Sequence, residues 1–94
     1  MDFLVVWSHK SMDKLERMAE EPQQFGGREG LARAIESLHT RLCKEPLDVG
    51  EIYSLRGAVE SHLAVDGHLA IDFAVDKKRR LVLVRDVHEL FGEI

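Results

Sequence analysis

The sequence has few of the residues and patterns that build crosslinked or membrane-spanning proteins. Its single cysteine, Cys43, excludes a disulfide within the chain and fits a reducing cytoplasm. No apolar run approaches the roughly 20 residues that cross a bilayer, and the N-terminus lacks a signal-peptide pattern. With two prolines, no internal repeat and 94 residues in all, we expect residues 1–94 to form one cytoplasmic domain.

Motifs that hold metals or phosphates are also missing. Five histidines and one cysteine occur without a Cys-x-x-Cys or His-x-x-x-His spacing, so no metal site is predicted. Gly26-Gly27 lacks the lysine and the strand–turn–helix context of a phosphate-binding loop, and we predict no cofactor. The net charge of −4 excludes a surface devoted as a whole to nucleic acid, while a local basic patch stays compatible with it.

The C-terminal third carries the clearest strand pattern. Its middle run alternates large apolar residues with smaller or polar ones, which predicts a strand with one apolar face. The large residues are Leu69, Ile71, Phe73 and Val75. Asp66-Gly67 before this run is a hairpin signal, and the charged turn 76–80 separates it from a last run at 81–87. With the run at 59–65, these segments predict an antiparallel meander.

The upstream residues supply a cover for that apolar face. Residues 3–7 are rich in β-forming types and predict a first strand. Ser8 can cap a helix that ends at Pro22, and a second helix over 28–43 carries apolar residues at helical spacing. The order β-α-α-β-β-β predicts an α+β fold, with the helical hairpin on one face of an antiparallel sheet. The first strand joins this sheet at an edge, and residues 51–56 could add a further extended segment.

Four segments, taken with this order, resemble the RelE/ParE superfamily of bacterial toxin–antitoxin systems. They are Leu47-Asp-Val-Gly50, Leu55-Arg-Gly57, Gly67-His-Leu-Ala-Ile-Asp-Phe-Ala-Val75 and Val87-His88. The resemblance covers nearly the whole chain as an architecture and implies a RelE/ParE-like domain. It also implies an antitoxin protein as a partner, and either messenger RNA on the ribosome or DNA gyrase as a target.

Two positions of the family pattern bear on activity. Members that cut messenger RNA usually open the strand after the hairpin with an aromatic–arginine pair, whose arginine stabilises the scissile phosphate; His68-Leu69 stands there in this chain. Some members end the last strand in histidine–tyrosine, whereas His88 is followed by Glu89. These positions and the acidic charge favour a divergent, non-catalytic toxin-like component that binds a macromolecular partner. The alternative is a ribosome-dependent, metal-independent endoribonuclease.

Cleavage of RNA without a metal needs a base for the 2′-hydroxyl proton, a cation for the phosphorane charge and an acid for the leaving oxygen. The candidates for these roles are Arg56, His68, Arg85 and His88. In an ideal last strand Asp86 and His88 share one face, while Arg85 and Val87 share the other. His68 and Asp72 share a face of the preceding strand. The same polar groups also fit the plain solvent face of a sheet covered on one side only.

The densest cationic run is a second candidate surface. It consists of Lys77, Lys78, Arg79 and Arg80, and it could bind phosphates by counterion release. As a hairpin turn, the same run also fits a solubilising tip. For protein partners, an open edge of the sheet could accept an antitoxin segment. The helices or a sheet edge could also pair two copies of the chain as a homodimer.

Overall fold

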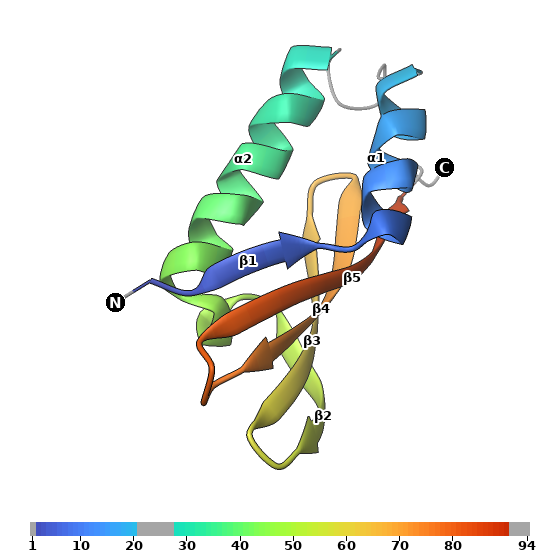
Figure 1. The fold of residues 1–94 in the computed structure, drawn as a ribbon. Helices are drawn as coiled ribbons and strands as arrows, with labels where there is room; N and C mark the ends of the chain where they lie inside the picture. The colour runs from blue at the N-terminus through green and yellow to red at the C-terminus, as the bar shows by residue number, and fades with distance from the viewer. Residues whose placement is uncertain (1, 21–27, 91–94) are drawn as a thin grey trace.

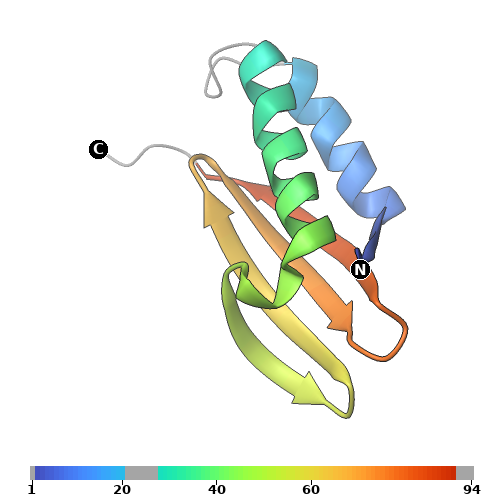
Figure 2. The same ribbon diagram turned by 90° about the vertical axis from the view of Figure 1, so that its left-hand side faces the viewer.

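The computed structural model describes residues 2–20 and 28–90, and it has two helices on one face of a five-stranded sheet (Figures 1 and 2). The helices are α1 (His9–Glu20) and α2 (Arg28–Lys44), and the strands are β1 (Leu4–Trp7), β2 (Glu51–Arg56), β3 (Val59–Asp66), β4 (Leu69–Asp76) and β5 (Leu81–Glu89). A short 3-10 helix, η2 (Pro46–Asp48), precedes β2. The predicted α+β class is confirmed, while the predicted helix end at Pro22 lies outside the described residues. None of the described helices has the length and apolar character needed to cross a membrane.

The sheet is mixed, with the strand order β1-β5-β4-β3-β2. The meander from β2 to β5 is antiparallel, whereas β1 pairs with β5 in parallel and places Leu4 opposite Leu81. The edge position of the first strand is therefore confirmed, but the sheet is not purely antiparallel. Residues 51–56 form a full strand, which confirms the further extended segment that the sequence allowed, so four strands follow the helices. We call the sheet face that lies away from the two described helices the open face.

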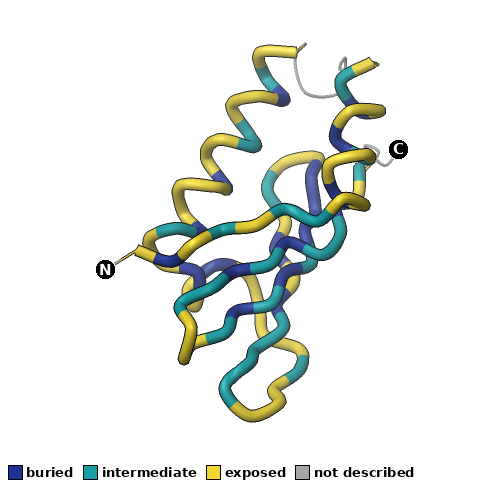
Figure 3. The backbone as a smooth tube through the Cα atoms, in the orientation of Figure 1, coloured by how far each residue is buried: buried dark blue, intermediate teal, exposed yellow. Residues whose placement is uncertain are grey.

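The core lies between the helices and the sheet, and β4 is its centre. The large residues of β4 are fully buried, which confirms the predicted alternation. They pack with residues of β5, α1 and α2, among them Leu15, Met18, Leu31, Leu38, Leu42, Val82, Val84 and Val87. Phe73 also stacks on the ring of His62 at 5.2 Å between centroids. Figure 3 shows the burial concentrated along the middle strands and exposure along the tip of the β2–β3 hairpin.

Strand β5 departs from the ideal alternation at Arg85. Phe73 lies opposite Val84, but Asp72 lies opposite Asp86, so Arg85 is an extra residue that forms a bulge. Beyond the bulge the alternation changes phase, and Val87 is fully buried like Val84. The predicted sharing of one face by Arg85 and Val87 was therefore wrong, because the spacing rule assumes an unbroken strand.

Two serines tie the start of α1 to this bulge. The Ser8 hydroxyl accepts a hydrogen bond from the backbone N–H of Ser11 at 3.1 Å, which confirms Ser8 as the helix cap. The buried Ser11 hydroxyl donates to the carbonyl of Val84 at 3.1 Å. The backbone N–H of Ser8 donates to the same carbonyl at 2.9 Å. The chain thus leaves β1 and begins α1 directly beside the residue that precedes Arg85.

Candidate functional site

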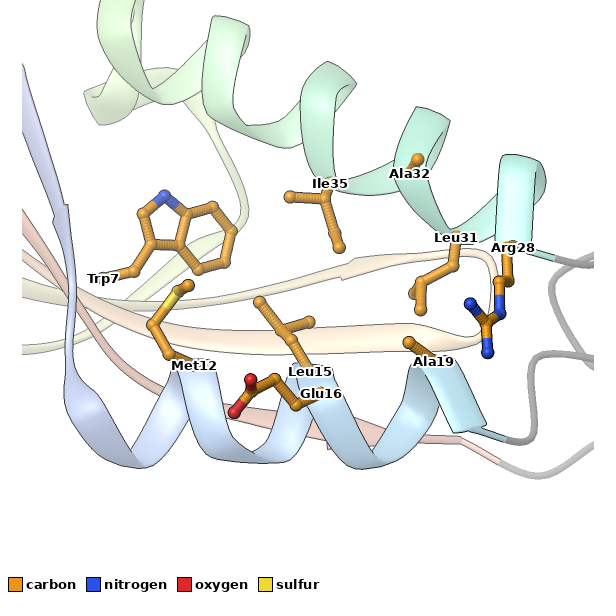
Figure 4. A pocket seen from close by; sticks show the side chains of 9 residues that line it. All are labelled: Trp7, Met12, Leu15, Glu16, Ala19, Arg28, Leu31, Ala32 and Ile35. Carbon is orange, nitrogen blue, oxygen red and sulfur yellow. The ribbon is translucent and has the colours of Figure 1, made fainter.

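A hollow of about 440 Å³ opens between the two helices, and we call it the interhelical hollow (Figure 4). It is lined by Trp7, Met12, Leu15, Glu16, Ala19, Arg28, Leu31, Ala32 and Ile35. In Figure 4 the indole of Trp7 lies at one end and Arg28 at the other, with apolar side chains of α1 and α2 facing each other between them. The hollow therefore runs along the two helices rather than into the core.

The interhelical hollow is suited to apolar side chains. Only Glu16 and Arg28 among its lining residues are charged, and Met12 is 48% exposed. The indole N–H of Trp7 donates to Nδ1 of His39 at 3.0 Å, so the polar edge of the ring is satisfied and its position is fixed. An exposed apolar surface of this kind on a small domain is typical of a binding site for another protein.

The open face carries a second candidate, a cluster of Tyr53, Asp72 and Arg85 that we call the tyrosine–arginine cluster. The Tyr53 hydroxyl donates to Oδ1 of Asp72 at 2.7 Å. Nη2 of Arg85 lies 2.9 Å from the same Oδ1 and 2.9 Å from the Tyr53 oxygen. Tyr53 and Arg85 also line a hollow of about 270 Å³ with Ser54, Arg56, Val59 and Ser61. The bulge at Arg85 brings the guanidinium to this face.

The electrostatics of the cluster oppose free acid–base chemistry. The hydrogen bond to Asp72, together with burial, raises the pKa of Tyr53 above its ordinary value of 10.0. Tyr53 is therefore a proton donor at neutral pH and not a base. The guanidinium of Arg85 forms an ion pair with Asp72 at 2.9 Å, so an anion that binds there would have to compete with this carboxylate. The cluster holds its three side chains to one another.

Removal of Asp72 is expected to lower the pKa of Tyr53. In the variant Asp72→Ala the hydroxyl loses its acceptor and the neighbouring carboxylate charge, while the guanidinium of Arg85 stays and favours the phenolate. Tyr53 is the one tyrosine of the chain, so absorbance near 295 nm as a function of pH follows it alone. Wild-type protein should titrate above an ordinary tyrosine and Asp72→Ala below wild type. Equal curves for the two proteins would contradict the hydrogen bond.

The four predicted catalytic residues fall into two groups. Arg56 and Arg85 line the same hollow on the open face. His68 lies in the β3–β4 turn rather than on β4, and its Nδ1 is 3.1 Å from the carbonyl oxygen of Leu90. His88 is near the end of β5, opposite Ala70 at the start of β4. The predicted common face of His68 and Asp72 on one strand was therefore wrong, because β4 begins only after His68.

Asp86 has stronger partners than His88. Its Oδ1 lies 2.7 Å from Nζ of Lys14 and its Oδ2 lies 3.1 Å from Nζ of Lys10, whereas Nε2 of His88 is 3.5 Å away. Burial acts to raise the pKa of Asp86, but the hydrogen bonds from Lys14 and Lys10 outweigh it and bring the pKa to about 2. Asp86 mainly fixes α1 against β5.

The cationic turn between β4 and β5 is largely occupied by contacts within the chain. Nζ of Lys77 lies 3.0 Å from Oε2 of Glu60, and this lysine, with His62, lowers the pKa of that carboxyl. Nη1 of Arg79 lies 3.1 Å from Oδ2 of Asp76. The guanidinium of Arg80 lies 4.4 Å above the ring of Phe3. Structural contacts therefore engage Lys77, Arg79 and Arg80.

Tyr53 is the functional candidate that the sequence did not indicate. It belongs to a segment predicted only as extended, and it is the extra residue of a bulge in β2, since Ile52 lies opposite His62 and Ser54 opposite Ser61. Its side chain reaches Asp72 two strands away. Two features of the sequence could have indicated Tyr53: it is the one tyrosine of the chain, and it lies just before Leu55-Arg56-Gly57.

The chain was compared with protein families, curated proteins and solved structures, and only the solved structures gave matches. No protein-family model matches the chain, and no curated protein is significantly similar to it in sequence. A chain of the toxin–antitoxin complex RelBE2 from Mycobacterium tuberculosis is similar in structure, with a TM-score of 0.69 and 19% identity over 95% of this chain and 99% of that one. A chain of the archaeal RelE–RelB complex from Pyrococcus horikoshii is also similar in structure, with a TM-score of 0.73 and 13% sequence identity. The match covers 95% of this chain and 96% of that one. The chain therefore has a RelE-like fold, which confirms the fold that the family resemblance implied.

Proposed function

We propose that the chain is the toxin-like component of a bacterial toxin–antitoxin pair, acting in the cytoplasm by binding another macromolecule. The observation that carries this proposal is the fold likeness over 95% of the chain to chains from two toxin–antitoxin complexes. The apolar hollow that the described residues leave between α1 and α2 supports it, since a protein that binds a partner needs an exposed apolar surface. Residues 1–94 would act as one unit.

The proposed partner is an antitoxin that inserts the apolar side chains of an amphipathic helix into the interhelical hollow. The hollow follows two neighbouring helices from Trp7 to Arg28 (Figure 4), which suits a row of anchors spaced at helical intervals. Glu16 and Arg28 supply one charge of each sign for the polar flank of such a helix. The predicted docking of an antitoxin at a sheet edge is a separate possibility that the same complex would test.

Binding rather than catalysis is proposed because three of the predicted phosphate-binding cations, Lys77, Arg79 and Arg85, are already paired with carboxylates. Stabilising a phosphorane requires a cation directed at the developing charge. Arg85 is bonded to Asp72 instead, and Lys77 and Arg79 are bonded to Glu60 and Asp76. Targets compatible with binding are gyrase and the ribosome.

One observation favours the alternative, a metal-independent endoribonuclease. Arg56, Arg85 and the protonated hydroxyl of Tyr53 line one hollow on the open face, and together they offer two cations and an acid. Primer extension on messenger RNA with ribosomes present distinguishes the two proposals. New cleavage products that vanish with Arg85→Ala would establish the enzyme, and growth arrest that His88→Ala alone abolishes would count strongly against the non-catalytic proposal. No cleavage at any dose would remove the endoribonuclease.

Filling the interhelical hollow is expected to weaken the antitoxin complex. The variant Ala32→Arg places a long charged side chain on the exposed wall of the hollow without touching the core. Binding to the product of the neighbouring gene, measured by co-purification and calorimetry, should weaken at least about tenfold, which corresponds to about 1.4 kcal/mol. Thermal stability should change little, since the site is on the surface.

The matched control is Ser37→Arg. Ser37 is also exposed on α2 but does not line the hollow, so the same new side chain should leave binding unchanged. Equal losses in the two variants would contradict the proposed docking site. Wild-type protein that forms no complex with the neighbouring product on co-expression would contradict the toxin–antitoxin proposal itself.

A further inference from the structure

Strand β2 is the last strand of the sheet that the structure describes, so the backbone groups on its outer side are unpaired within the sheet. Figure 1 shows it on the side of the sheet opposite β1. Three of its six side chains are large and half exposed: Ile52 at 49%, Tyr53 at 58% and Leu55 at 60%. An edge strand with such side chains is a template for one more strand.

The bulge in β2 determines which of its residues share a face. Ile52 lies opposite His62 and Leu55 lies opposite Glu60. Opposed residues of an antiparallel pair share a face, and His62 is buried, so Ile52 and Leu55 are on the face that carries the helices. The remaining residues of β2 are on the open face. These are Glu51, Tyr53, Ser54 and Arg56.

This face pattern reads the same in both directions along β2. From Glu51 to Arg56 it is open, helix-bearing, open, open, helix-bearing, open. A second β2 laid antiparallel therefore meets the first with every opposed pair on a common face. The opposed pairs are Glu51 with Arg56, Ile52 with Leu55, and Tyr53 with Ser54. A regular strand of six residues could not pair in this way, because its first and last residues lie on opposite faces.

The charges at the two ends of β2 select the same arrangement. Glu51 of one copy would lie opposite Arg56 of the second copy, and two-fold symmetry would form this pair twice. Edges that are protected against pairing often use charges that repel another copy, whereas these two charges complement each other. We infer that two copies of this chain pair through antiparallel β2 strands, so that two five-stranded sheets form one continuous sheet.

Pairing would join the open faces of the two copies. The hollow that contains Tyr53, Ser54 and Arg56 borders β2. Tyr53 and Ser54 lie at the proposed two-fold axis, so the hollows of the two copies would adjoin across it. The dimer would thus present one extended surface with two tyrosine–arginine clusters. This inference is independent of the proposed toxin role.

Sedimentation equilibrium of the whole chain tests the pairing. Interfaces well below about 1,600 Å² are usually weak, so we expect a dissociation constant roughly in the micromolar range. Glu51→Arg and Arg56→Glu should each weaken the dimer at least about tenfold, because each change turns both end pairs into like-charge pairs. The double variant restores opposite charges and should return to within about threefold of wild type. The control Glu29→Arg, on exposed α2, should have no effect.

A crosslink tests the register directly. In a Cys43→Ser background, Ile52→Cys protein mixed with Leu55→Cys protein should form a mixed disulfide more readily than either protein alone, because these positions oppose each other only between copies. Rescue by the charge-swapped double variant together with this crosslink would support the dimer. A monomer at all concentrations up to about 1 mM would overturn it. A dimer insensitive to the charge changes would overturn it too, since another surface would then join the copies.

Discussion

The variant Phe73→Ala is expected to lower the free energy of unfolding by about 3–5 kcal/mol. Phe73 is fully buried at the centre of β4, where its ring stacks on His62 and packs among the apolar residues beneath α2. Truncation to alanine removes the ring from this contact and leaves a cavity that the surrounding strands cannot fill. A domain of this size has about 5–14 kcal/mol of stability in total, so the loss is a large fraction of it.

Urea denaturation followed by circular dichroism measures this loss. The control is Leu63→Ala on β3, since Leu63 is 47% exposed on the open face, and its truncation should cost less than about 1 kcal/mol. If Phe73→Ala cost no more than the control, β4 would not be the centre of the core. The helices would then be held by contacts other than the apolar face of the meander.

The part of the fold that the sequence predicts is the part decided by periodicity. In β4 every second residue is large and apolar. Because side chains alternate between the two faces of a strand, this pattern assigns all the large residues to the buried face. The helix over 28–43 was placed in the same way, and the structure extends it by one residue, to Lys44. The hairpin expected at Asp66-Gly67 forms, but its two turn residues are Gly67 and His68, because Asp66 still pairs with Leu69; Gly67 has the expected positive φ, 63°. Local preferences and the apolar pattern agree at these positions.

What the sequence did not predict depends on contacts between distant residues. The bulge at Arg85 arises where β5 must pair with β4 while the carbonyl of Val84 receives bonds from Ser8 and Ser11. No pattern within residues 81–89 signals an extra residue there. The parallel pairing of β1 with β5 is likewise a choice of topology, because an apolar run such as residues 4–7 fits either direction.

The candidate site also combines residues that the sequence indicated with an arrangement that depends on contacts between distant strands. Arg56 and Arg85 were selected as charged residues near the meander, and they line one hollow only because both β2 and β5 carry bulges. Tyr53 and Asp72 complete the cluster by side-chain bonds across three strands, which no spacing rule predicts. His68 and His88 were chosen for their chemistry, yet they lie near the other end of β4 from Arg56.

The pairing of cations with carboxylates on the open face bears on which kind of partner this face can bind. The guanidinium of Arg85 on this face already has the carboxylate of Asp72 beside it. Such pairs on a partly exposed surface contribute little stability, so their main effect is on what the face can bind. A protein partner with both charge signs is better matched to this face than a polyanion, in line with the net charge of −4.

The variant Gly50→Ala is expected to lower the free energy of unfolding by about 2–5 kcal/mol. Gly50 directly precedes β2 and has a φ of 68°, a left-handed conformation that costs alanine about 1–2 kcal/mol. A Cβ atom at this position would also overlap the carbonyl oxygen of Leu63 and lie 2.7 Å from Cβ of Ala64. These atoms belong to β3, so relief requires β2 to move away from its partner strand, at a further cost of about 1–3 kcal/mol.

The control Gly67→Ala separates crowding from backbone strain. Gly67 has a similar φ of 63°, but a Cβ there would meet no atom of residues 2–20 or 28–90 within 4 Å, so only the conformational cost of about 1–2 kcal/mol applies. Thermal melts should therefore place Gly50→Ala several degrees below Gly67→Ala, since 1 kcal/mol corresponds to about 4–8 °C in a domain of this size. Equal melting temperatures would show that β2 can shift freely against β3. In that case Tyr53 would not be held beside Asp72, and the edge of β2 would lack the fixed face pattern on which pairing of two copies depends.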